Sequence, residues 1–217
     1  MARKIALVTD FDGTISHDDF FYYITDRYFD EAALEPWRQY LRGEKSHFAA
    51  LSEIFAKIRL PEAELLRFID GISYDKSFWK TAKLCFDRKI PLTICSAGCD
   101  YYIHRILGQA LNEYDIRLVT NHGIYGENTG LVMVAPPSES LYYDKDVGIS
   151  KAAVVQDYQR RGFEVVFAGD GPPDFAPAKL ADVVFAKKFL LEKCREVGIP
   201  TRRFDSYDDV YDYLKEL

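Results

Sequence analysis

The chain has 217 residues, of which 48% are hydrophobic, and a formal net charge of −6 at pH 7. A chain of this length can bury one full hydrophobic core and a smaller second unit. The acidic balance and the lack of a basic run argue against a nucleic-acid-binding protein. No apolar stretch approaches the ~20 residues that a membrane helix needs, and no cleavable signal pattern precedes the first apolar run, so we expect a cytoplasmic protein without a membrane partner.

The first predicted element is a strand over Ile5 to Val8 that runs straight into the motif Asp-Phe-Asp-Gly-Thr. Ligands of parallel α/β sheets bind beyond the carboxyl ends of the strands, where Asp10 stands and Asp12 follows. Gly13 allows a sharp turn or a positive φ, and the Thr14 hydroxyl can tie down the loop. Two carboxylates this close repel each other, and oxygen ligands of this kind suit Mg²⁺. The motif therefore predicts a cation and phosphate site, the alternative being a surface Asp-Gly turn.

A helical pattern of about 75 residues follows, far longer than an ordinary loop of ~4–6 residues. We expect it to form an inserted helical cap over residues 16–87, on a catalytic domain made of residues 1–15 and 88–217. Within it, Asp19 and Phe20 are candidates for substrate binding, and Arg59 is a candidate for contacting a substrate carboxylate. The alternatives are a dipole-complementing acid, a core aromatic residue and a solvated arginine, respectively.

The next apolar run, Pro91 to Cys95, predicts a second strand, and apolar residues at helical spacing follow it. Ser96, Ala97 and Gly98 stand at the turn between them. A hydroxyl and free N–H groups at a helix N-terminus form a phosphate site. This segment is therefore a candidate anion cradle, unless Ser96 is simply an N-cap.

The stretch from residue 121 to residue 150 is rich in Gly, Pro and Tyr and predicts a hairpin or a long loop. Lys151 follows it in the first turn of a predicted helix, where a cation opposes the helix dipole. Such an unfavourable charge suggests that Lys151 balances a phosphoryl group. The alternative is a solvated surface lysine.

The run Val165 to Ala168 predicts a buried strand that ends in a second acidic turn. Asp170 would complete the coordination of the metal. Asp174 would orient the motif lysine or ligate through water. Within this turn, Pro173 favours an extended Pro172. The alternative is a Gly/Pro loop that merely breaks the strand.

The last predicted element is a helix over residues 206–217, N-capped by Ser206, to which we assign no chemistry. The four cysteines show no Cys-x-x-Cys spacing, and the histidines do not join them in a zinc pattern. We therefore expect reduced and mostly buried cysteines.

Taken in order, these motifs resemble the haloacid-dehalogenase-like phosphohydrolases over nearly the whole chain. Within that superfamily the chain is similar to the phosphoserine-phosphatase branch and, more narrowly, to the 2-hydroxy-3-keto-5-methylthiopentenyl-1-phosphate phosphatases of methionine salvage. The narrower likeness rests on residues 96–102, 121–122, 181–186 and 190–196. The resemblance implies an α/β fold, with a Rossmann-like parallel sheet flanked by helices and an inserted α-helical cap.

The resemblance also implies a Mg²⁺-dependent phosphatase that hydrolyses a small phosphorylated metabolite through an aspartyl-phosphate. Asp10 would be the nucleophile and Asp12 the general acid and base. The metal would be held by the carboxylates of Asp10 and Asp170 and by the backbone carbonyl of Asp12. Ser96, the amides beside it and Lys151 would compensate the phosphoryl charge.

Several alternatives stay open. A phosphoserine-phosphatase-like enzyme with a different phosphomonoester substrate is the nearest one. A non-catalytic phosphoaspartate switch of receiver type would need no helical cap, and a hydrolytic dehalogenase would have little use for Asp12 or Asp170. The sequence leaves the oligomeric state open.

Overall fold

The computed structural model describes residues 3–217, so residues 1 and 2 of the expected catalytic domain lie outside the described residues. Its main sheet has the strand order β4-β3-β2-β1-β7-β8-β9. All pairs in this sheet are parallel except the hairpin pair β3–β4. The strands of this sheet are β1 (Ile5–Thr9), β2 (Leu92–Cys99), β3 (Arg117–Gly126), β4 (Gly130–Val134), β7 (Glu164–Gly169), β8 (Val183–Ala186) and β9 (Arg202–Arg203). A separate short pair is formed by β5 (Tyr143–Asp144) and β6 (Gly148–Ile149).

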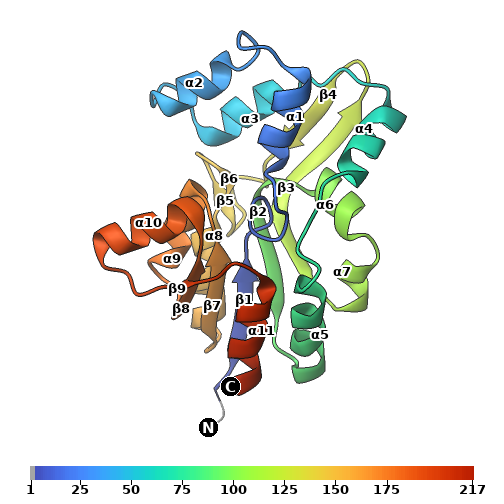
Figure 1. Cartoon of the computed structure of the whole chain (residues 1–217). Helices are drawn as coiled ribbons and strands as arrows, with labels where there is room; N and C mark the ends of the chain where they lie inside the picture. Colours follow the sequence, from blue (N-terminus) through green and yellow to red (C-terminus); the bar gives the residue numbers. More distant parts are fainter. Residues whose placement is uncertain (1–2) are drawn as a thin grey trace.

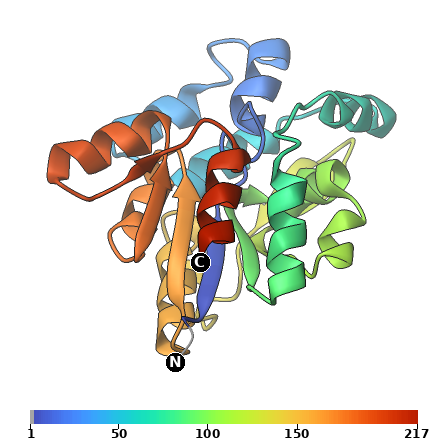
Figure 2. The ribbon, with the colours of Figure 1, turned by 60° about the horizontal axis from the view of Figure 1, so that its bottom comes forward.

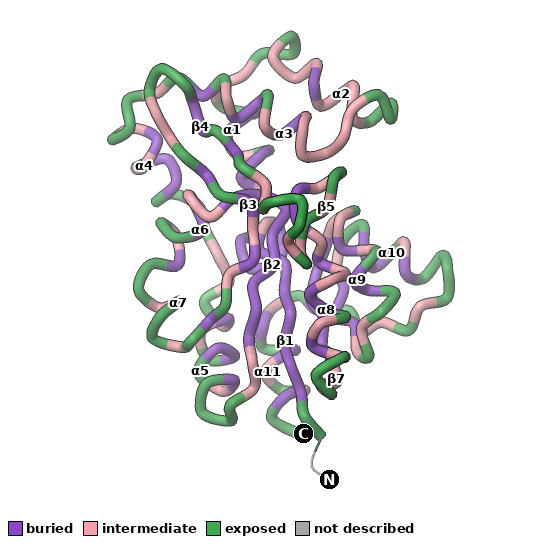
Figure 3. The backbone as a smooth tube through the Cα atoms, turned by 180° about the vertical axis from the view of Figure 1, so that it is seen from behind, coloured by how far each residue is buried: buried purple, intermediate pink, exposed green. Residues whose placement is uncertain are grey.

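The centre of the sheet is β1, which pairs with β2 on one side and β7 on the other. All its residues are buried, as expected for a parallel strand covered on both faces (Figure 3). Ile5 and Leu7 belong to the core on one face, and Ala6 and Val8 belong to the core on the opposite face. Side chains alternate along a strand, so one apolar run serves both cores. The three strands run in the same direction, and the loops after them meet at one edge.

Helices cover both faces of the sheet (Figure 1). On one face α5 and α11 pack side by side (Figure 2). The opposite face is covered by α8, whose buried residues join the core of α10. The helices of this part are α5 (Phe78–Arg88), α6 (Asp100–Leu107), α7 (Ala110–Glu113), α8 (Lys151–Arg160), α9 (Phe175–Ala178), α10 (Lys188–Val197) and α11 (Tyr207–Glu216). The expected helix-flanked parallel sheet is confirmed.

The helices between β1 and β2 form two groups that pack against different parts of the molecule. Its first helices are α1 (Phe20–Tyr28), α2 (Glu35–Leu41), α3 (His47–Phe55) and α4 (Glu62–Asp70). Above the sheet edge, α2 packs on α3, α3 contacts β4, and α4 contacts α6 (Figure 1). The fifth helix, α5, contacts α11 and β2 instead. The packing therefore separates α5 from the other helices of the expected cap range, 16–87, because its apolar face meets the sheet.

Three local features bear on the predictions from the sequence: the hairpin, the end of β2 and the turn at Pro172. The predicted hairpin or long loop contains the β3–β4 hairpin, with Gly130 at φ 75° in its turn. Strand β2 continues through Cys99 with a register shift after Ser96, rather than ending at Cys95. Pro172 begins a 3₁₀ turn, Pro172–Asp174, rather than an extended segment. A proline suits this first position because its missing N–H needs no partner there.

Two further expectations concern membrane-spanning helices and the cysteines. No helix in the described part of the chain is long and apolar enough to cross a membrane. All four cysteines are free and buried, as expected.

Candidate active site

The carboxyl edge of the sheet gathers a buried cluster of charges. Asp10 follows β1, Asp170 follows β7, and Lys151 opens α8. The Lys151 Nζ lies 2.5 Å from Asp10 Oδ1 and 2.6 Å from Asp174 Oδ1. These side chains are almost completely buried, so the ion pairs are poorly screened by water. Lys151 is thus not a solvated surface lysine.

Asp174 uses both of its carboxylate oxygens within this cluster. While Oδ1 contacts Lys151, Oδ2 accepts hydrogen bonds from the amides of Asp170 and Gly171, at 2.9 and 3.0 Å. The side chain thereby ties the 3₁₀ turn Pro172–Asp174 to the preceding loop that carries Asp170. Asp174 holds both the lysine and the loop in place, which is one of the two roles considered from the sequence.

The acidic residues of the cluster lie close enough to share a cation. One carboxylate oxygen from each of Asp10, Asp170 and Asp174 lies within 4.8 Å of the others. Burial, followed by repulsion from Asp174, raises the pKa of Asp10 well above its ordinary value and also raises that of Asp170. Such crowding is relieved by a divalent cation, and an oxygen-only set of ligands suits Mg²⁺.

Three further residues border this cluster. Gly13 has φ 71°, as the expected sharp turn requires, and an added Cβ would overlap Asp170. The Thr14 hydroxyl donates to Asp170 Oδ1 at 3.2 Å. Lys188 Nζ lies 2.9 Å from Asp170 Oδ2 and donates to the Gly13 carbonyl at 3.0 Å. Sequence reasoning missed Lys188, although its place just after β8 is a signal that would have pointed to this edge.

The Asp12 side chain turns away from the cluster and accepts three hydrogen bonds. Its donors are the Tyr102 hydroxyl at 2.6 Å, the Ser96 hydroxyl at 3.1 Å and the Phe20 amide at 3.2 Å. Burial raises the pKa of Asp12, although these donors favour the charged form. A carboxyl group of this kind can hold a proton nearer to neutral pH than a surface aspartate. Tyr102 was not among the predicted site residues.

The segment Ser96–Gly98 lies inside β2 and differs from the expected anion cradle. Ser96, Ala97 and Gly98 all line the cavity, but the Gly98 amide donates to Ser96 Oγ at 3.0 Å and is therefore engaged. Asn121 supports this end of β2 by donating to the carbonyls of Ala97 and Gly98, at 2.9 and 3.1 Å. A Cβ at residue 98 would overlap the Tyr102 hydroxyl, so glycine is required for this contact.

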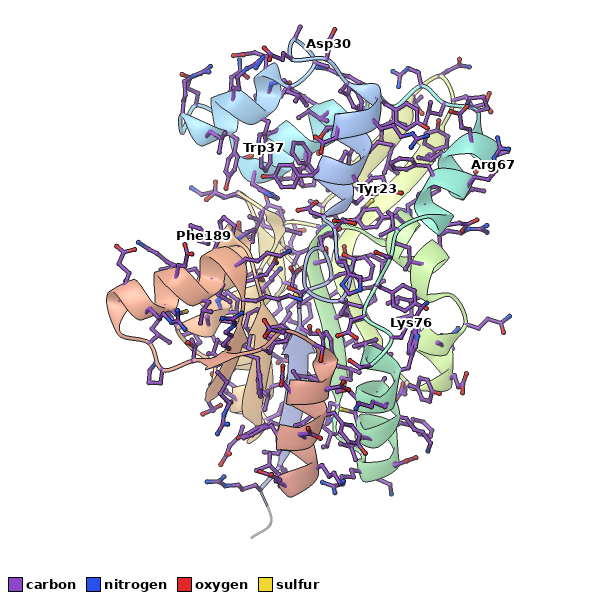
Figure 4. All side chains as sticks on the ribbon, viewed as in Figure 1. Tyr23, Asp30, Trp37, Arg67, Lys76 and Phe189 are labelled. Carbon is purple, nitrogen blue, oxygen red and sulfur yellow. The ribbon has the colours of Figure 1, made fainter. Side chains whose placement is uncertain are left out.

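A cavity of about 580 Å³ extends from the acidic cluster to the helices above it. Its upper wall is mostly aromatic and apolar. Trp37 enters from the upper helices and Phe189 from α10 below (Figure 4). The upper lining also includes the acids Asp18, Asp19 and Asp26. The remaining aromatic, histidine and aliphatic residues of this wall are His17, Phe21, Tyr22, Tyr23, Tyr40, Leu41, His47, Leu51 and Phe55.

The candidates for substrate binding are placed differently from one another. Asp19 lines the cavity and also N-caps α1, and burial raises its pKa to about 8. Phe20 instead packs in the core, with its ring stacked on that of Tyr102. Arg59 donates to backbone carbonyls beside it, and neither Phe20 nor Arg59 lines the cavity. Phe20 thus has the position of a core aromatic residue, and Arg59 that of an exposed, solvated arginine.

Comparisons with known proteins agree with this arrangement. The family model for haloacid dehalogenase-like hydrolases matches residues 7–179. A 2-hydroxy-3-keto-5-methylthiopentenyl-1-phosphate phosphatase of Brevibacillus brevis is 26% identical over 224 residues, which cover 100% of this chain and 98% of the relative. A polyol phosphate phosphatase of Saccharomyces cerevisiae is 24% identical over 233 residues, which cover 99% and 94%. A solved substrate-bound phosphoserine phosphatase complex has a TM-score of 0.70 at 16% identity and covers 98% of this chain and 99% of that one.

The chain belongs to the haloacid dehalogenase-like hydrolases, as its motifs indicated. Curated relatives named as phosphatases match over nearly the full length of the chain. The expected enzyme class, a phosphoric monoester hydrolase, is therefore confirmed, and the family's fold is shared with phosphoserine phosphatase.

Proposed function

We propose that this protein is a Mg²⁺-dependent phosphatase that hydrolyses a small phosphorylated metabolite through an aspartyl-phosphate on Asp10. The observation that carries the proposal is the buried contact of Lys151 with Asp10 and Asp174 on the floor of a 580 Å³ cavity. A buried cation beside a carboxylate nucleophile and crowded acids suits the transfer of an anionic phosphoryl group. The cavity supplies the room for an ester that a phosphoaspartate switch would not need.

Each step of the proposed reaction has a residue to perform it. An oxygen of Asp10 attacks phosphorus, the bond to the leaving oxygen breaks, and Asp12 donates its proton to that oxygen. In the second step, Asp12 takes a proton from water while the water oxygen attacks phosphorus and releases Asp10. The hydrogen bonds of Asp12 to Tyr102 and Ser96 hold its carboxyl group at the wall of the cavity.

The acidic cluster fits a divalent metal because its carboxylates are buried and crowded, and because the pKa values of Asp10 and Asp170 are raised by that burial. Asp10 and Asp170 would hold Mg²⁺ with their carboxylates, and Asp12 with its backbone carbonyl. When bound, Mg²⁺ supplies positive charge that offsets the charge on the phosphoryl oxygens. Lys151, the Ser96 hydroxyl and the Ala97 amide would contact the phosphoryl group, whereas the Gly98 amide already donates to Ser96 Oγ.

The helices above the sheet edge would form the cap. We propose that it comprises α1 to α4 and that the catalytic domain includes α5, since α5 packs on α11 and β2. A cap that closes over the cavity excludes bulk water from the reacting groups. We further propose a cytoplasmic location, which suits four free, buried cysteines.

For the substrate we propose 2-hydroxy-3-keto-5-methylthiopentenyl-1-phosphate, after the relatives of that name that match over the full length. The alternative is another phosphomonoester, for which the yeast polyol phosphate phosphatase is a precedent.

The choice of substrate is tested by measuring kcat/KM for 2-hydroxy-3-keto-5-methylthiopentenyl-1-phosphate, hereafter the enol phosphate, and for glycerol 3-phosphate and phosphoserine. The kcat/KM for the enol phosphate should exceed the values for the other two esters by at least about 10-fold. A clear preference for another ester would reject the methionine-salvage substrate while leaving the phosphatase in place.

A further inference from the structure

His47 is a polar side chain on the cavity wall that lacks a protein partner. It is the first residue of α3 and lines the upper part of the cavity. Its Nδ1 is buried and forms no hydrogen bond with any residue in the range 3–217. A buried polar atom without a partner is costly, and native proteins rarely keep one without a reason. A ligand that supplies the missing hydrogen bond is such a reason.

The imidazole of His47 is held firmly by its neighbours. The rings of Trp37 and Tyr40 meet it edge-on, with centroids at 5.6 and 5.3 Å. Its helix is fixed at the same end, because Ser46 caps it and the Phe48 amide donates to the Asp146 carbonyl at 2.8 Å. A polar group that aromatic rings hold in one orientation can select a ligand by the direction of a hydrogen bond as well as by packing.

The charges around the cavity indicate what kind of leaving group fits. Among residues 3–217, the lysines and arginines that line it are Lys151 and Lys188, and carboxylates on the floor engage both. The upper wall carries Asp18, Asp19 and Asp26 instead. A leaving group with its own carboxylate would meet acidic neighbours and no free cation, so the wall favours an uncharged one.

The protonation state of His47 agrees with an uncharged partner. Burial, with a smaller effect of Lys151, lowers its pKa to about 4. At neutral pH the ring therefore offers one N–H donor and one acceptor nitrogen, which together can bind a hydroxyl or a carbonyl.

We propose that His47 is a specificity residue that hydrogen-bonds a hydroxyl or carbonyl on the uncharged, partly apolar leaving group of the phosphate ester, with Trp37 and Tyr40 packed against the same group. The assignment rests on the phosphatase activity proposed above. It adds the chemical class of the leaving group and a residue that distinguishes it.

The decisive experiment compares kcat/KM of the wild type and His47→Phe in Mg²⁺ for three probes. Glycerol 3-phosphate and 3-phosphoglycerate form a matched pair that differs by a carboxylate, and acetyl phosphate is a probe with a leaving group of only two carbons and no hydroxyl. We expect the wild type to favour glycerol 3-phosphate over 3-phosphoglycerate by at least ~10-fold. His47→Phe should lose ~10–100-fold on glycerol 3-phosphate, mainly through KM, and stay within ~2-fold on acetyl phosphate.

Two more variants separate recognition from folding. His47→Asn and His47→Gln place an amide near the position of Nδ1 or Nε2, and at least one of them should recover part of the lost kcat/KM. His104→Phe, at an exposed position on α6, is the matched control and should leave all three values unchanged.

Binding can be followed without turnover in a protein that carries Asp10→Asn and Trp79→Phe, which leaves Trp37 as the remaining tryptophan. Glycerol 3-phosphate should change its fluorescence, and adding His47→Phe should raise the apparent Kd by at least ~10-fold.

An equal loss on acetyl phosphate and glycerol 3-phosphate, or no loss on either, would overturn the role of His47. A wild type that prefers 3-phosphoglycerate would overturn the uncharged class. If the wild type releases phosphate from none of the esters, the phosphatase proposal fails, and the assignment of His47 fails with it.

Discussion

Asp12 illustrates how the surroundings of a single residue set its chemistry. Its carboxylate lies apart from the Lys151 cluster and contacts Tyr102, Ser96 and the Phe20 amide. We expect Asp12→Asn to slow turnover by about 10²–10⁴-fold, because proton transfer to the leaving oxygen is lost. Since the proposed metal ligand is the backbone carbonyl, calorimetry should show a Mg²⁺ affinity within about 3-fold of the wild type. A large loss of affinity would reject this coordination.

Tyr102 provides a finer test at the same carboxylate. Tyr102→Phe removes a 2.6 Å hydrogen bond that favours the charged form of Asp12, so the pKa of Asp12 should rise further. Activation of water needs the charged form, and the acidic limb of the kcat profile should therefore move to higher pH. Tyr101→Phe, at the neighbouring half-buried position, serves as the control. Identical pH profiles for the wild type and Tyr102→Phe would contradict the account.

Asp19 links protonation to stability. In the metal-free protein its pKa is about 8, against an ordinary value of 3.8. Between these values the native state binds a proton that the unfolded chain has released, so the unfolding free energy falls as pH rises through this window. Asp19→Asn keeps a side chain that can N-cap α1. The unfolding free energy of this variant should fall less steeply as pH rises, and its Tm at pH 8 in chelator should be higher than that of the wild type by a few degrees. Asp26→Asn, on the exposed side of α1, should leave the slope unchanged, and an unchanged slope for Asp19→Asn would contradict the shift.

Site residues could be predicted from the sequence where a strand end fixes their place. Asp10 and Asp170 follow β1 and β7, and Ser96 lies in the last part of β2, so all three lie near the carboxyl edge of the sheet. Tyr102 and His47 could not be predicted in this way, because their roles depend on contacts between side chains distant in sequence. Lys188, two residues after β8, could have been found by the same rule, although its φ of 48° is unusual for lysine.

At the scale of elements, α11 is a structural helix that needs its cap. Ser206 accepts a hydrogen bond from the Asp208 amide, and the Asp209 side chain accepts from the Ser206 amide. Ser206→Ala should lower the unfolding free energy by about 1 kcal/mol in a denaturant titration and leave kcat unchanged. Ser138→Ala, in an exposed loop, is the control. A fall in kcat without a fall in stability would show that α11 acts on the site.

The boundary of the inserted helices shows where patterns in the sequence stop being informative. Helical periodicity indicates that α5 is amphipathic but not which partner its apolar face meets. In the structure Thr81 on α5 donates to the Tyr207 carbonyl on α11, and the Tyr207 amide donates to Asp75. Such pairings join segments more than a hundred residues apart, so only the tertiary structure assigns α5 to the sheet.

For the whole molecule, the order of strands places the acidic motifs at one edge of the sheet, and helices lie above that edge (Figure 1). Side chains of these helices and of the sheet edge line the cavity. The sequence predicted this architecture because buried parallel strands and a long helical insertion have few other arrangements. The shape and charge of the cavity could not be predicted, since they result from side chains of α1, α2 and α3 meeting in space.

Phosphate release from glycerol 3-phosphate and the enol phosphate, with Mg²⁺ and with chelator, tests the central claim most directly when wild type and Asp10→Asn are measured side by side. We expect release by the wild type in Mg²⁺, a loss of at least about 10³-fold in chelator, and a similar loss in Asp10→Asn. Near-normal release by Asp10→Asn, or by the wild type in chelator, would contradict it.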